Sequence, residues 1–331
     1  AFRHFCGGES IDQCKSTIEN LAKFNIGTIL DYSVEGKESE EDFNRSLQQT
    51  LSTIAKAKGD KHIPFSVFKP SGIGSIQLLE KKNEGKLLST EELEQYSRFY
   101  TRVLQICQAG YDNNVPIYID AEESWIQIVV DELAREMMIK FNRKKAIIYN
   151  TLQMYRTDRL SYLTACIEHA RTNEYILGVK IVRGAYMEKE RERAKKMGYP
   201  SPIHENKAGT DKDYNAAIAL CVQHIDRVYL CAGTHNEASC LELTNLMKEK
   251  NITNDHEHIW FSQLYGMSDH ITYNLAKEHF NTSKYVPYGP ITSVLPYLIR
   301  RAQENTSVAG QTGRELALIL TEKQRRKKAT N

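Results

Sequence analysis

The chain alternates between short apolar segments and longer amphipathic segments along most of its length. Eight of the apolar segments are rich in β-branched residues and are four to eight residues long, which is the length of a typical strand. Several are hydrophobic almost without interruption, as is typical of parallel strands that are buried on both faces. The predicted strands are residues 26–31, 63–69, 116–120, 146–153, 178–183, 228–232, 259–263 and 284–287.

The amphipathic segments between these strands predict helices, because their apolar residues recur at the spacing of one helical face. The predicted helices are residues 41–57, 91–109, 126–140, 156–171, 213–224, 238–250 and 271–278. Eight strands alternating with helices indicate an α/β protein with a single-domain (β/α)8 barrel, or TIM barrel. A doubly wound sheet is the alternative, but no G-x-G-x-x-G sequence follows the first strand. Residues 2–21 predict a helix that caps the barrel base or packs outside it, and the polar residues 71–90 predict an excursion after the second strand.

Charge and composition exclude several classes of function. With 44 basic and 42 acidic residues and no basic stripe, the chain lacks the pattern of a nucleic-acid-binding protein. The basic run at 323–328 indicates a solvated helix end, with weak contact to an anionic membrane surface as the alternative. Seven scattered cysteines without a C-x-x-C pair predict reduced thiols. No apolar run approaches the roughly 20 residues that span a bilayer, and a chain that begins with Ala1 is compatible with removal of an upstream targeting segment.

Polar residues end nearly every predicted strand. In a (β/α)8 barrel, the strand ends and the loops that follow them carry the chemistry. The polar residues at or just after these strand ends are Asp31, Glu35, Lys69, Asp120, Glu122, Glu123, Gln153, Lys180, Arg183, Thr234, His235, Asn236, Gln263 and Tyr285. Lys69 and Asp120 end adjacent strands, where they form either a structural salt bridge or a charged shelf for a ligand. Lys69 and Lys180 are also candidates for the Schiff base of an aldolase.

Two adjacent arginines, Arg300 and Arg301, end a mostly apolar stretch that predicts a helix. Burial of two guanidiniums is unfavourable unless an anion lies against them, and an Arg side chain matches a carboxylate with two parallel hydrogen bonds. Consecutive residues of a helix diverge by about 100°, so the two side chains would approach such a carboxylate from different sides. Solvated charges at a helix end are the alternative.

A metal site is not expected from the spacing of potential ligands. The residues that a barrel could bring together around a metal are Asp120, Glu122, His204 and His235. Their spacing matches no compact motif such as H-E-x-x-H.

Six segments together resemble the proline dehydrogenase family. They are IDAEE (119–123), NTLQMY (150–155), VKIVRGAYMEKER (179–191), GTHNE (233–237), FSQLYGM (261–267) and KYVPYGPITSVLPYLIRRAQEN (284–305). Their order and spacing match the family from about residue 2 to about residue 310. The resemblance implies a distorted (β/α)8 barrel catalytic domain over 1–310 that binds FAD, followed by a C-terminal helix and basic tail over 311–331.

The same resemblance implies a reaction and its partners. A member of this family oxidises L-proline to Δ1-pyrroline-5-carboxylate by hydride transfer to flavin N5, which is the first step of proline catabolism. It passes the electrons to a quinone in a membrane with which it associates peripherally. The implied location is the matrix face of the inner mitochondrial membrane in a eukaryote, and the cytoplasm or the periphery of the inner membrane in a bacterium.

The resemblance also implies roles for individual positions. Lys69 and its paired acid Asp120 match residues beside the substrate, and Lys180 matches a basic residue near flavin N5 that is Arg in many bacterial members. Arg300 and Arg301 match the pair that binds the proline carboxylate. The positions that match walls around the substrate ring are Tyr186, Leu264, Tyr285 and Tyr297. The positions that match cofactor contacts are Ala121, Gln153, Arg183, Gly184, Ala185, Thr234, His235 and Glu304. Glu35 matches a carboxylate that pairs with the first arginine and closes the pocket.

Two other activities remain as alternatives. Hydroxyproline dehydrogenases are the nearest, but members specialised for that substrate carry a small residue at the position of Tyr285, which favours proline here. A Schiff-base aldolase on the same barrel is the alternative from another class, and a flavin-free binding protein for a small amino acid is a third possibility that involves no catalysis. For proline oxidation the substrate amine has to be neutral, and a dry, cationic pocket lowers the pKa of an ammonium group. No strong general base is therefore expected.

Overall fold

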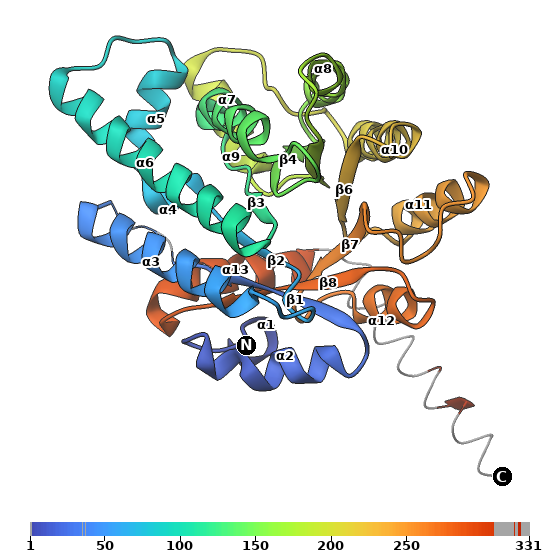
Figure 1. The fold of residues 1–331 in the computed structure, drawn as a ribbon. Coiled ribbons are helices and arrows are strands. Elements are labelled where there is room, and N and C mark those ends of the chain that lie inside the picture. The colour runs from blue at the N-terminus through green and yellow to red at the C-terminus, as the bar shows by residue number, and fades with distance from the viewer. Residues whose placement is uncertain (1, 35, 37, 308–320, 322–323, 326–331) are drawn as a thin grey trace.

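Strand pairing follows chain order all the way round the sheet. The computed structural model describes residues 2–34, 36, 38–307, 321 and 324–325. Each strand pairs in parallel with the next, and β8 pairs with β1, so that the sheet closes into a barrel (Figure 1). The strands are β1 (Ile26–Tyr32), β2 (Phe65–Phe68), β3 (Ile117–Ile119), β4 (Ile148–Gln153), β5 (Leu177–Val182), β6 (Val228–Gly233), β7 (Ile259–Leu264) and β8 (Thr282–Tyr288). The predicted barrel and all eight predicted strand positions are confirmed.

Helices surround the barrel and connect successive strands (Figure 1). The predicted ones are α3 (Glu40–Ala57), α6 (Thr90–Asn113), α7 (Ser124–Phe141), α8 (Arg159–Thr172), α10 (Lys207–Gln223), α11 (Glu237–Glu249) and α12 (Asp269–Lys277). Local sequence sets their ends. Ser89 and Glu92 form a reciprocal capping box at the start of α6. α10 starts earlier than predicted, because the side chain of Asn206 caps it by accepting a hydrogen bond from the backbone N–H of Gly209.

Three helices are absent from the sequence prediction. They are α4 (Pro70–Ile73) and α5 (Ile76–Asn83), which lie in the polar excursion after β2, and α9 (Met187–Met197). α4 is a single turn and α5 has 8 residues, so neither is long enough to show a clear apolar period. In α9 only Glu190 and Ala194 are buried. A helix without an apolar face gives no periodic signal in the sequence.

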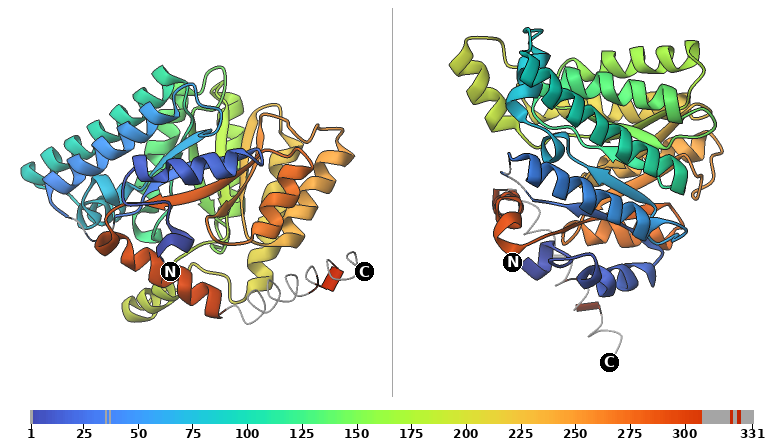
Figure 2. Two further views of the ribbon diagram at one scale, coloured as in Figure 1. Left: turned by 90° about the horizontal axis from the view of Figure 1, so that it is seen from below. Right: turned by 60° about the vertical axis from the view of Figure 1, so that its left-hand side comes forward.

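Residues 2–21 form separate pieces instead of the one predicted helix. α1 (Phe2–Phe5) contacts α13 (Ile291–Ser307), and α2 (Lys15–Ala22) contacts β1 outside the barrel. Phe5 and Met267 pack with Val294 and Leu298 of α13. Both views in Figure 2 place α1, α9 and α13 on the same side of the barrel. The N-terminal residues therefore support the helix that carries both arginines of the predicted site.

Aromatic rings fill the interior of the barrel. Phe65 stacks on Tyr118 with 4.4 Å between ring centroids, and Tyr118 lies parallel to Tyr285 at 6.4 Å. Tyr149 and Trp260 meet the same Phe65 ring edge-on. A filled interior leaves space for ligands only beyond the strand ends.

Two further expectations concern cysteines and membranes. All seven cysteines are free, in agreement with the predicted reduced thiols.

Within the described part of the chain, no helix has both the length and the hydrophobicity needed to cross a bilayer. The C-terminal helix and basic tail predicted for 311–331 lie almost entirely outside the described residues.

Candidate functional site

A cavity of about 460 Å³ lies at the C-terminal end of the barrel. Each of the eight strands, or the loop that follows it, contributes to its walls, and α13 forms one side. Because the barrel interior below is filled by aromatic rings, the bottom of the cavity is the layer that contains Tyr285. This is the end at which (β/α)8 barrels carry their chemistry.

Four alternating charges, here called the lysine–aspartate shelf, lie in the cavity: Asp31, Lys69, Asp120 and Lys180. Lys69 Nζ is 2.8 Å from Asp31 Oδ2 and 3.4 Å from Asp120 Oδ2. Lys180 Nζ donates to Asp120 Oδ1 and also lies 2.5 Å from Tyr285 Oη. Lys69 and Asp120 thus form a salt bridge, which was one of the two interpretations, and a role in orienting a ligand stays a prediction. Asp31, a polar strand-end residue to which the sequence gives no specific role, is the closer partner of Lys69.

The central charges of the shelf persist at neutral pH. Burial lowers the pKa of Lys69, but Asp31 and Asp120 raise it by more, so the pKa stands above its usual value. Burial raises the pKa of Asp120, but Lys180 and Lys69 outweigh burial and hold the pKa below its usual value. A Schiff-base nucleophile has to be a neutral amine. The ion pairs of both lysines therefore disfavour the aldolase alternative.

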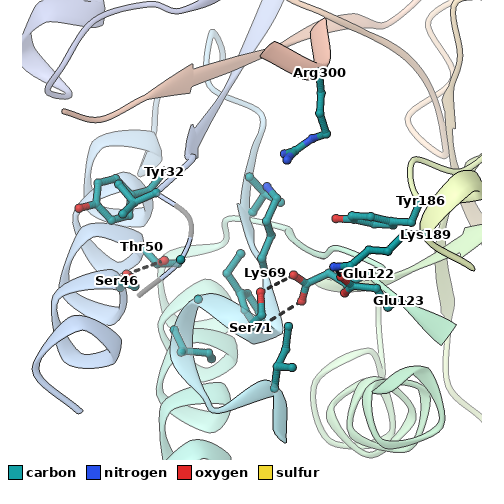
Figure 3. Close-up of a pocket in the computed structure, with 17 residues that line it drawn as sticks. Tyr32, Ser46, Thr50, Lys69, Ser71, Glu122, Glu123, Tyr186, Lys189 and Arg300 are labelled. Atoms are coloured by element: carbon teal, nitrogen blue, oxygen red, sulfur yellow. Dashed lines mark hydrogen bonds and ion pairs between the residues drawn. The ribbon is translucent and has the colours of Figure 1, made fainter. Parts of the chain in front are cut away.

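Helix α13 brings two guanidiniums to the cavity wall. Arg301 is 7% exposed, and its guanidinium carbon lies 5.0 Å from the centre of the Tyr297 ring. Arg300 lines this cavity and a smaller one beside it. Figure 3 shows its side chain reaching from α13 toward the space between Lys69 and Tyr186. The alternative of solvated charges at a helix end is therefore wrong for Arg301.

The opposite half of the cavity is built from loops that follow β4, β5 and β6. Gln153 Nε2 donates to the backbone oxygen of Glu122 at 2.7 Å, and the backbone N–H of Ala185 donates to Gln153 Oε1 at 3.3 Å. The hydroxyl of Thr234 accepts a hydrogen bond from Arg183 at 2.6 Å. Gln153, Arg183 and Thr234 thus line the cavity in positions fixed by neighbouring loops.

Arg183 is held by the protein at three points. Nε donates to Asp211 at 2.8 Å, Nη1 to Thr234 at 2.6 Å and Nη2 to Ser239 at 2.8 Å, and the guanidinium lies over the Tyr214 ring. Within the described residues these bonds use three of the five N–H groups of a guanidinium. The remaining two N–H groups suit a phosphate oxygen. The contact with the phosphate chain of FAD is compatible with this arrangement and stays a prediction.

The protein's own structure explains why residue 184 is glycine, without any ligand. Its φ is +140°, a conformation that L side chains rarely adopt. A Cβ atom at this position would lie 2.5 Å from the ring of Tyr155. The close approach that requires glycine is therefore to a neighbouring side chain, and the loop turns at this point to bring Ala185 to the cavity.

His235 is neutral throughout the physiological pH range. Burial, followed by the charges of Lys284 and Arg301, lowers its pKa to about 3. Its Nε2 accepts from the backbone N–H of Leu264 at 3.5 Å, and its Nδ1 lies 2.9 Å from the hydroxyl of Ser268, so a ring proton on Nδ1 suits both contacts. His235 thus contributes a fixed polar surface rather than a charge.

The residues present fit a flavin. Thr151 Oγ1 lines the cavity and is buried without a hydrogen-bond partner among the described residues, and a buried hydroxyl of this kind is satisfied by a polar ligand edge. The walls that carry no bulky side chain, and so admit a flat ring system, are formed by Ala121, Gly184, Ala185 and Gly233. The predicted contacts Gln153 and Thr234 lie on the same side.

The smaller cavity, of about 220 Å³, adjoins the main one at Lys69, Tyr186 and Arg300 (Figure 3). One wall contains Glu122, a buried carboxyl group that accepts hydrogen bonds from the backbone N–H and the hydroxyl of Ser71. Burial raises the pKa of Glu122 from 4.5 to about 7, because the hydrogen bonds from Ser71 offset burial only in part.

Glu122 is expected to make stability depend on pH. Between pH 4.5 and about 7, the folded protein binds a proton that the unfolded chain releases, so this group's contribution to stability falls as pH rises. We expect the stability of Glu122→Gln, which cannot titrate, to rise by roughly 2–3 kcal/mol relative to that of the wild type between pH 5 and pH 8. Urea unfolding of both proteins at pH 5 and pH 8 measures this difference. An equal difference at both values would contradict a raised pKa.

Most predicted site residues line the main cavity. They are Lys69, Asp120, Ala121, Gln153, Lys180, Arg183, Gly184, Ala185, Tyr186, Thr234, His235, Leu264, Tyr285, Tyr297, Arg300 and Arg301. Glu35 lies outside the described residues, and Glu304 lies on α13 with its side chain outside them. The described residues contain no group of three or more side chains placed to hold a metal, and His204 instead pairs with Asp213 at 2.7 Å. The individual roles stay predictions.

Three residues in the walls of the two cavities have no specific role predicted from the sequence: Asp31, Glu122 and Thr151. Asp31 and Glu122 are acids at or just beyond predicted strand ends, so position gives a signal for both. Thr151 lies inside β4, and nothing in the sequence distinguishes it from a hydroxyl that packs in the core.

Comparison with known proteins agrees with the resemblance seen in the sequence. A family model described as proline dehydrogenase matches residues 14–314. The carbapenem antibiotics biosynthesis protein CarD of Pectobacterium carotovorum subsp. carotovorum is 36% identical over 322 residues, which cover 97% of this chain and 83% of that protein. The mitochondrial proline dehydrogenase 1 of Dictyostelium discoideum is 33% identical over 369 residues, which cover 98% of this chain and 64% of that protein.

A solved structure shares the fold. Proline utilization A (PutA) from Bdellovibrio bacteriovorus superposes with a TM-score of 0.82 at 21% identity, over 93% of this chain and 33% of that chain. The chain thus spans a third of that protein and somewhat less than two thirds of the Dictyostelium enzyme. Because the family model covers nearly the whole chain and both curated relatives exceed 30% identity, this chain belongs to the proline dehydrogenase family.

Proposed function

We propose that this chain is an FAD-dependent enzyme that oxidises L-proline to Δ1-pyrroline-5-carboxylate and passes the electrons to a quinone. The observation that carries the proposal is that Arg300 and Arg301 line the same cavity as the lysine–aspartate shelf. Two guanidiniums suit a substrate carboxylate. Family membership supports proline as the substrate, and the Dictyostelium relative carries the name of this activity.

The chain's own residues hold and orient the substrate in this proposal. Arg300 and Arg301 bind the carboxylate, and the ring is enclosed by Tyr186, Leu264, Tyr285 and Tyr297. Bound FAD supplies the acceptor for a hydride from the carbon beside the ring nitrogen. Lys180, fixed by Asp120 and Tyr285, places a positive charge where negative charge develops. The main contributions of the protein are thus orientation and electrostatics.

The substrate amine has to lose its proton before the hydride leaves. Nearby positive charge and exclusion of water both disfavour an ammonium group. The two guanidiniums of α13 supply the positive charge at the cavity wall. His235, with its pKa lowered to about 3, is not required as a base.

A spectroscopic assay tests the proposal. Purified protein supplied with FAD is expected to show a flavin absorption band that bleaches when L-proline is added without oxygen. The bleached protein is expected to reduce a soluble quinone analogue, with pyrroline-5-carboxylate as the product. A colourless protein that forms a borohydride-trapped adduct with its substrate would indicate the aldolase instead. An FAD-loaded protein that L-proline does not bleach would contradict the proposal.

The native acceptor in this proposal is a membrane quinone, reached by peripheral association. Relatives from Dictyostelium, Arabidopsis and human are named as mitochondrial. In a eukaryotic cell the proposed location is therefore the matrix face of the inner membrane, and in a bacterium the cytoplasm or the inner-membrane periphery. The choice of a membrane quinone as acceptor is tested by adding liposomes that contain quinone and measuring whether the quinone is reduced when proline is supplied.

Hydroxyproline is the second candidate substrate, because a hydroxyproline dehydrogenase from Xenopus laevis is 29% identical over 98% of this chain. Tyr285 Oη is held by Lys180 at 2.5 Å and donates to Asp120 at 3.1 Å, so its ring cannot move aside easily. We expect kcat/KM for L-proline to exceed that for trans-4-hydroxy-L-proline by about tenfold or more, as one misplaced group costs in a tight pocket. Tyr285→Ser should reduce this ratio. A wild-type preference for hydroxyproline would reverse the assignment.

A further inference from the structure

Glu122 connects the two halves of the main cavity. It lies two residues after Asp120 on the loop that follows β3, and it is 4% exposed. Its Oε2 accepts a hydrogen bond from the backbone N–H of Ser71 at 2.9 Å, and its Oε1 accepts one from the Ser71 hydroxyl. Ser71 is the second residue of α4, and Lys69 immediately precedes that helix. Glu122 therefore holds the segment that positions Lys69.

The N-terminus of α4 depends on a residue outside the helix to accept its first hydrogen bond. Lys69 occupies the N-cap position of α4, but its side chain makes no capping hydrogen bond. Pro70, the first residue of the helix, has no N–H. The first backbone donor of α4 is the N–H of Ser71, which is the group that Glu122 binds. Without Glu122, the first N–H of this part-buried, single-turn helix loses its acceptor.

The backbone oxygen of Glu122 faces the other half of the cavity. It accepts from Gln153 Nε2 at 2.7 Å, and Gln153 Oε1 accepts from the backbone N–H of Ala185 at 3.3 Å. A chain of hydrogen bonds thus crosses the ends of β2, β3, β4 and β5. It joins the segment that carries Lys69 to the loop that is expected to lie along FAD.

We propose that Glu122 is a positioning residue that fixes Lys69 relative to the loop of Gly184 and Ala185, and hence the substrate relative to the flavin. This inference rests on the proposed oxidation of proline. Hydride transfer requires the reacting atoms within about 3–3.5 Å, and a misplacement of about 1 Å can lower the rate by about a hundredfold. A residue that sets this spacing affects catalysis through the residues that it holds.

The two donors of Ser71 favour the ionised form of Glu122, but burial outweighs them and raises its pKa. The charged groups around Glu122 are Glu123 on the same loop, Lys69 beyond β2, Lys189 on α9 and Arg300 on α13 (Figure 3). Protonation below a pH of about 7 changes one oxygen from an acceptor to a donor, which weakens the bond to Ser71. We therefore expect the KM of the wild type for proline to rise at acid pH, partly because Glu122 becomes protonated. Glu122→Gln should lack that part of the rise.

Four variants of the full chain, loaded with FAD, test the proposal. Glu122→Ala is expected to lower kcat/KM by about tenfold to a hundredfold and to reduce the FAD retained after gel filtration. Ser71→Ala removes the hydroxyl bond to Glu122 but keeps the backbone bond, so it should raise KM for proline by less than Glu122→Ala does, while FAD retention stays unchanged. Glu122→Gln keeps one acceptor and should recover most FAD retention. Glu123→Gln is the matched control, because this neighbouring buried carboxylate pairs with Lys189 instead, and it should stay within about twofold of the wild type.

Wild-type KM, kcat and FAD retention in both Glu122→Ala and Ser71→Ala would overturn the proposal. If Glu122→Ala does not fold, the other two variants test the proposal. A wild-type KM and a wild-type pH profile in both Ser71→Ala and Glu122→Gln would then overturn it. A wild type that retains FAD but does not oxidise proline would refute the proposed function. In that case FAD retention by the variants still decides whether Glu122 holds the flavin loop.

Discussion

Replacing Arg301 with methionine is expected to raise the KM for L-proline by about a hundredfold to a thousandfold. Each hydrogen bond to a charged group contributes about 1.5–3 kcal/mol, two parallel bonds are lost together, and about 1.4 kcal/mol corresponds to a factor of ten. Arg301 is buried and lies over the Tyr297 ring, so its guanidinium is already oriented. Initial rates over a wide range of proline concentrations, with an artificial electron acceptor, measure the effect.

Two further variants separate geometry from charge at this position. Arg301→Lys keeps the charge but loses the bidentate fork, so its KM should lie between those of the wild type and Arg301→Met. Arg300→Met should have a smaller effect, because Arg300 is only half-buried and also faces the smaller cavity. Saturating proline should restore a kcat within about tenfold of the wild type in all three. An unchanged KM in Arg301→Met would contradict the assignment of the carboxylate to this side chain.

Replacing Asp120 with asparagine is expected to destabilise the protein by about 3–5 kcal/mol, the usual cost of leaving a buried charge uncompensated. Asp120 bonds to Lys69 and to Lys180, and it is the carboxylate that separates these two positive charges. Lys69 keeps Asp31, whereas Lys180 keeps the hydroxyl of Tyr285. Urea unfolding at neutral pH measures the loss. We also expect most activity to disappear, because both lysines then move apart.

The double variant Asp120→Asn/Lys180→Met provides the control for this prediction. Removing both partners removes the uncompensated charge, so most of the lost stability should return while activity stays low. The effect also has a defined pH range. Because the pKa of Asp120 is held below its usual value of 3.8, its contribution is present above that pH and disappears as pH falls further. A stability of Asp120→Asn equal to that of the wild type at pH 7 would show that the shelf is not coupled in this way.

The strands were predictable because burial on both faces leaves nearly continuous apolar runs, as in β4 and β5. The same reasoning fails for α9, whose buried positions are Glu190 and Ala194. Its place is determined by tertiary contacts: Glu190 accepts hydrogen bonds from the backbone and hydroxyl of Ser124 at the start of α7. No local pattern records a pairing between residues that are so far apart in the chain.

Candidate site residues were predictable to the extent that they end strands. Lys69 and Asp120 directly follow β2 and β3, whereas Lys180 lies inside β5, and the barrel brings all three to one cavity. Their partners were less predictable. Glu122 is one of two consecutive glutamates after Asp120, and only distances show that it binds Ser71 whereas Glu123 binds Lys189.

By itself, the sequence determined that this chain folds as a barrel of the proline dehydrogenase type, with polar residues gathered at the strand ends. These features follow from the order of apolar runs and from short motifs, both of which are local properties of the chain. Only the tertiary structure decided that Asp31 is the closer partner of Lys69, that Gly184 accommodates Tyr155 and that His235 is neutral. Each of these depends on distance and burial between segments that meet only when the barrel closes.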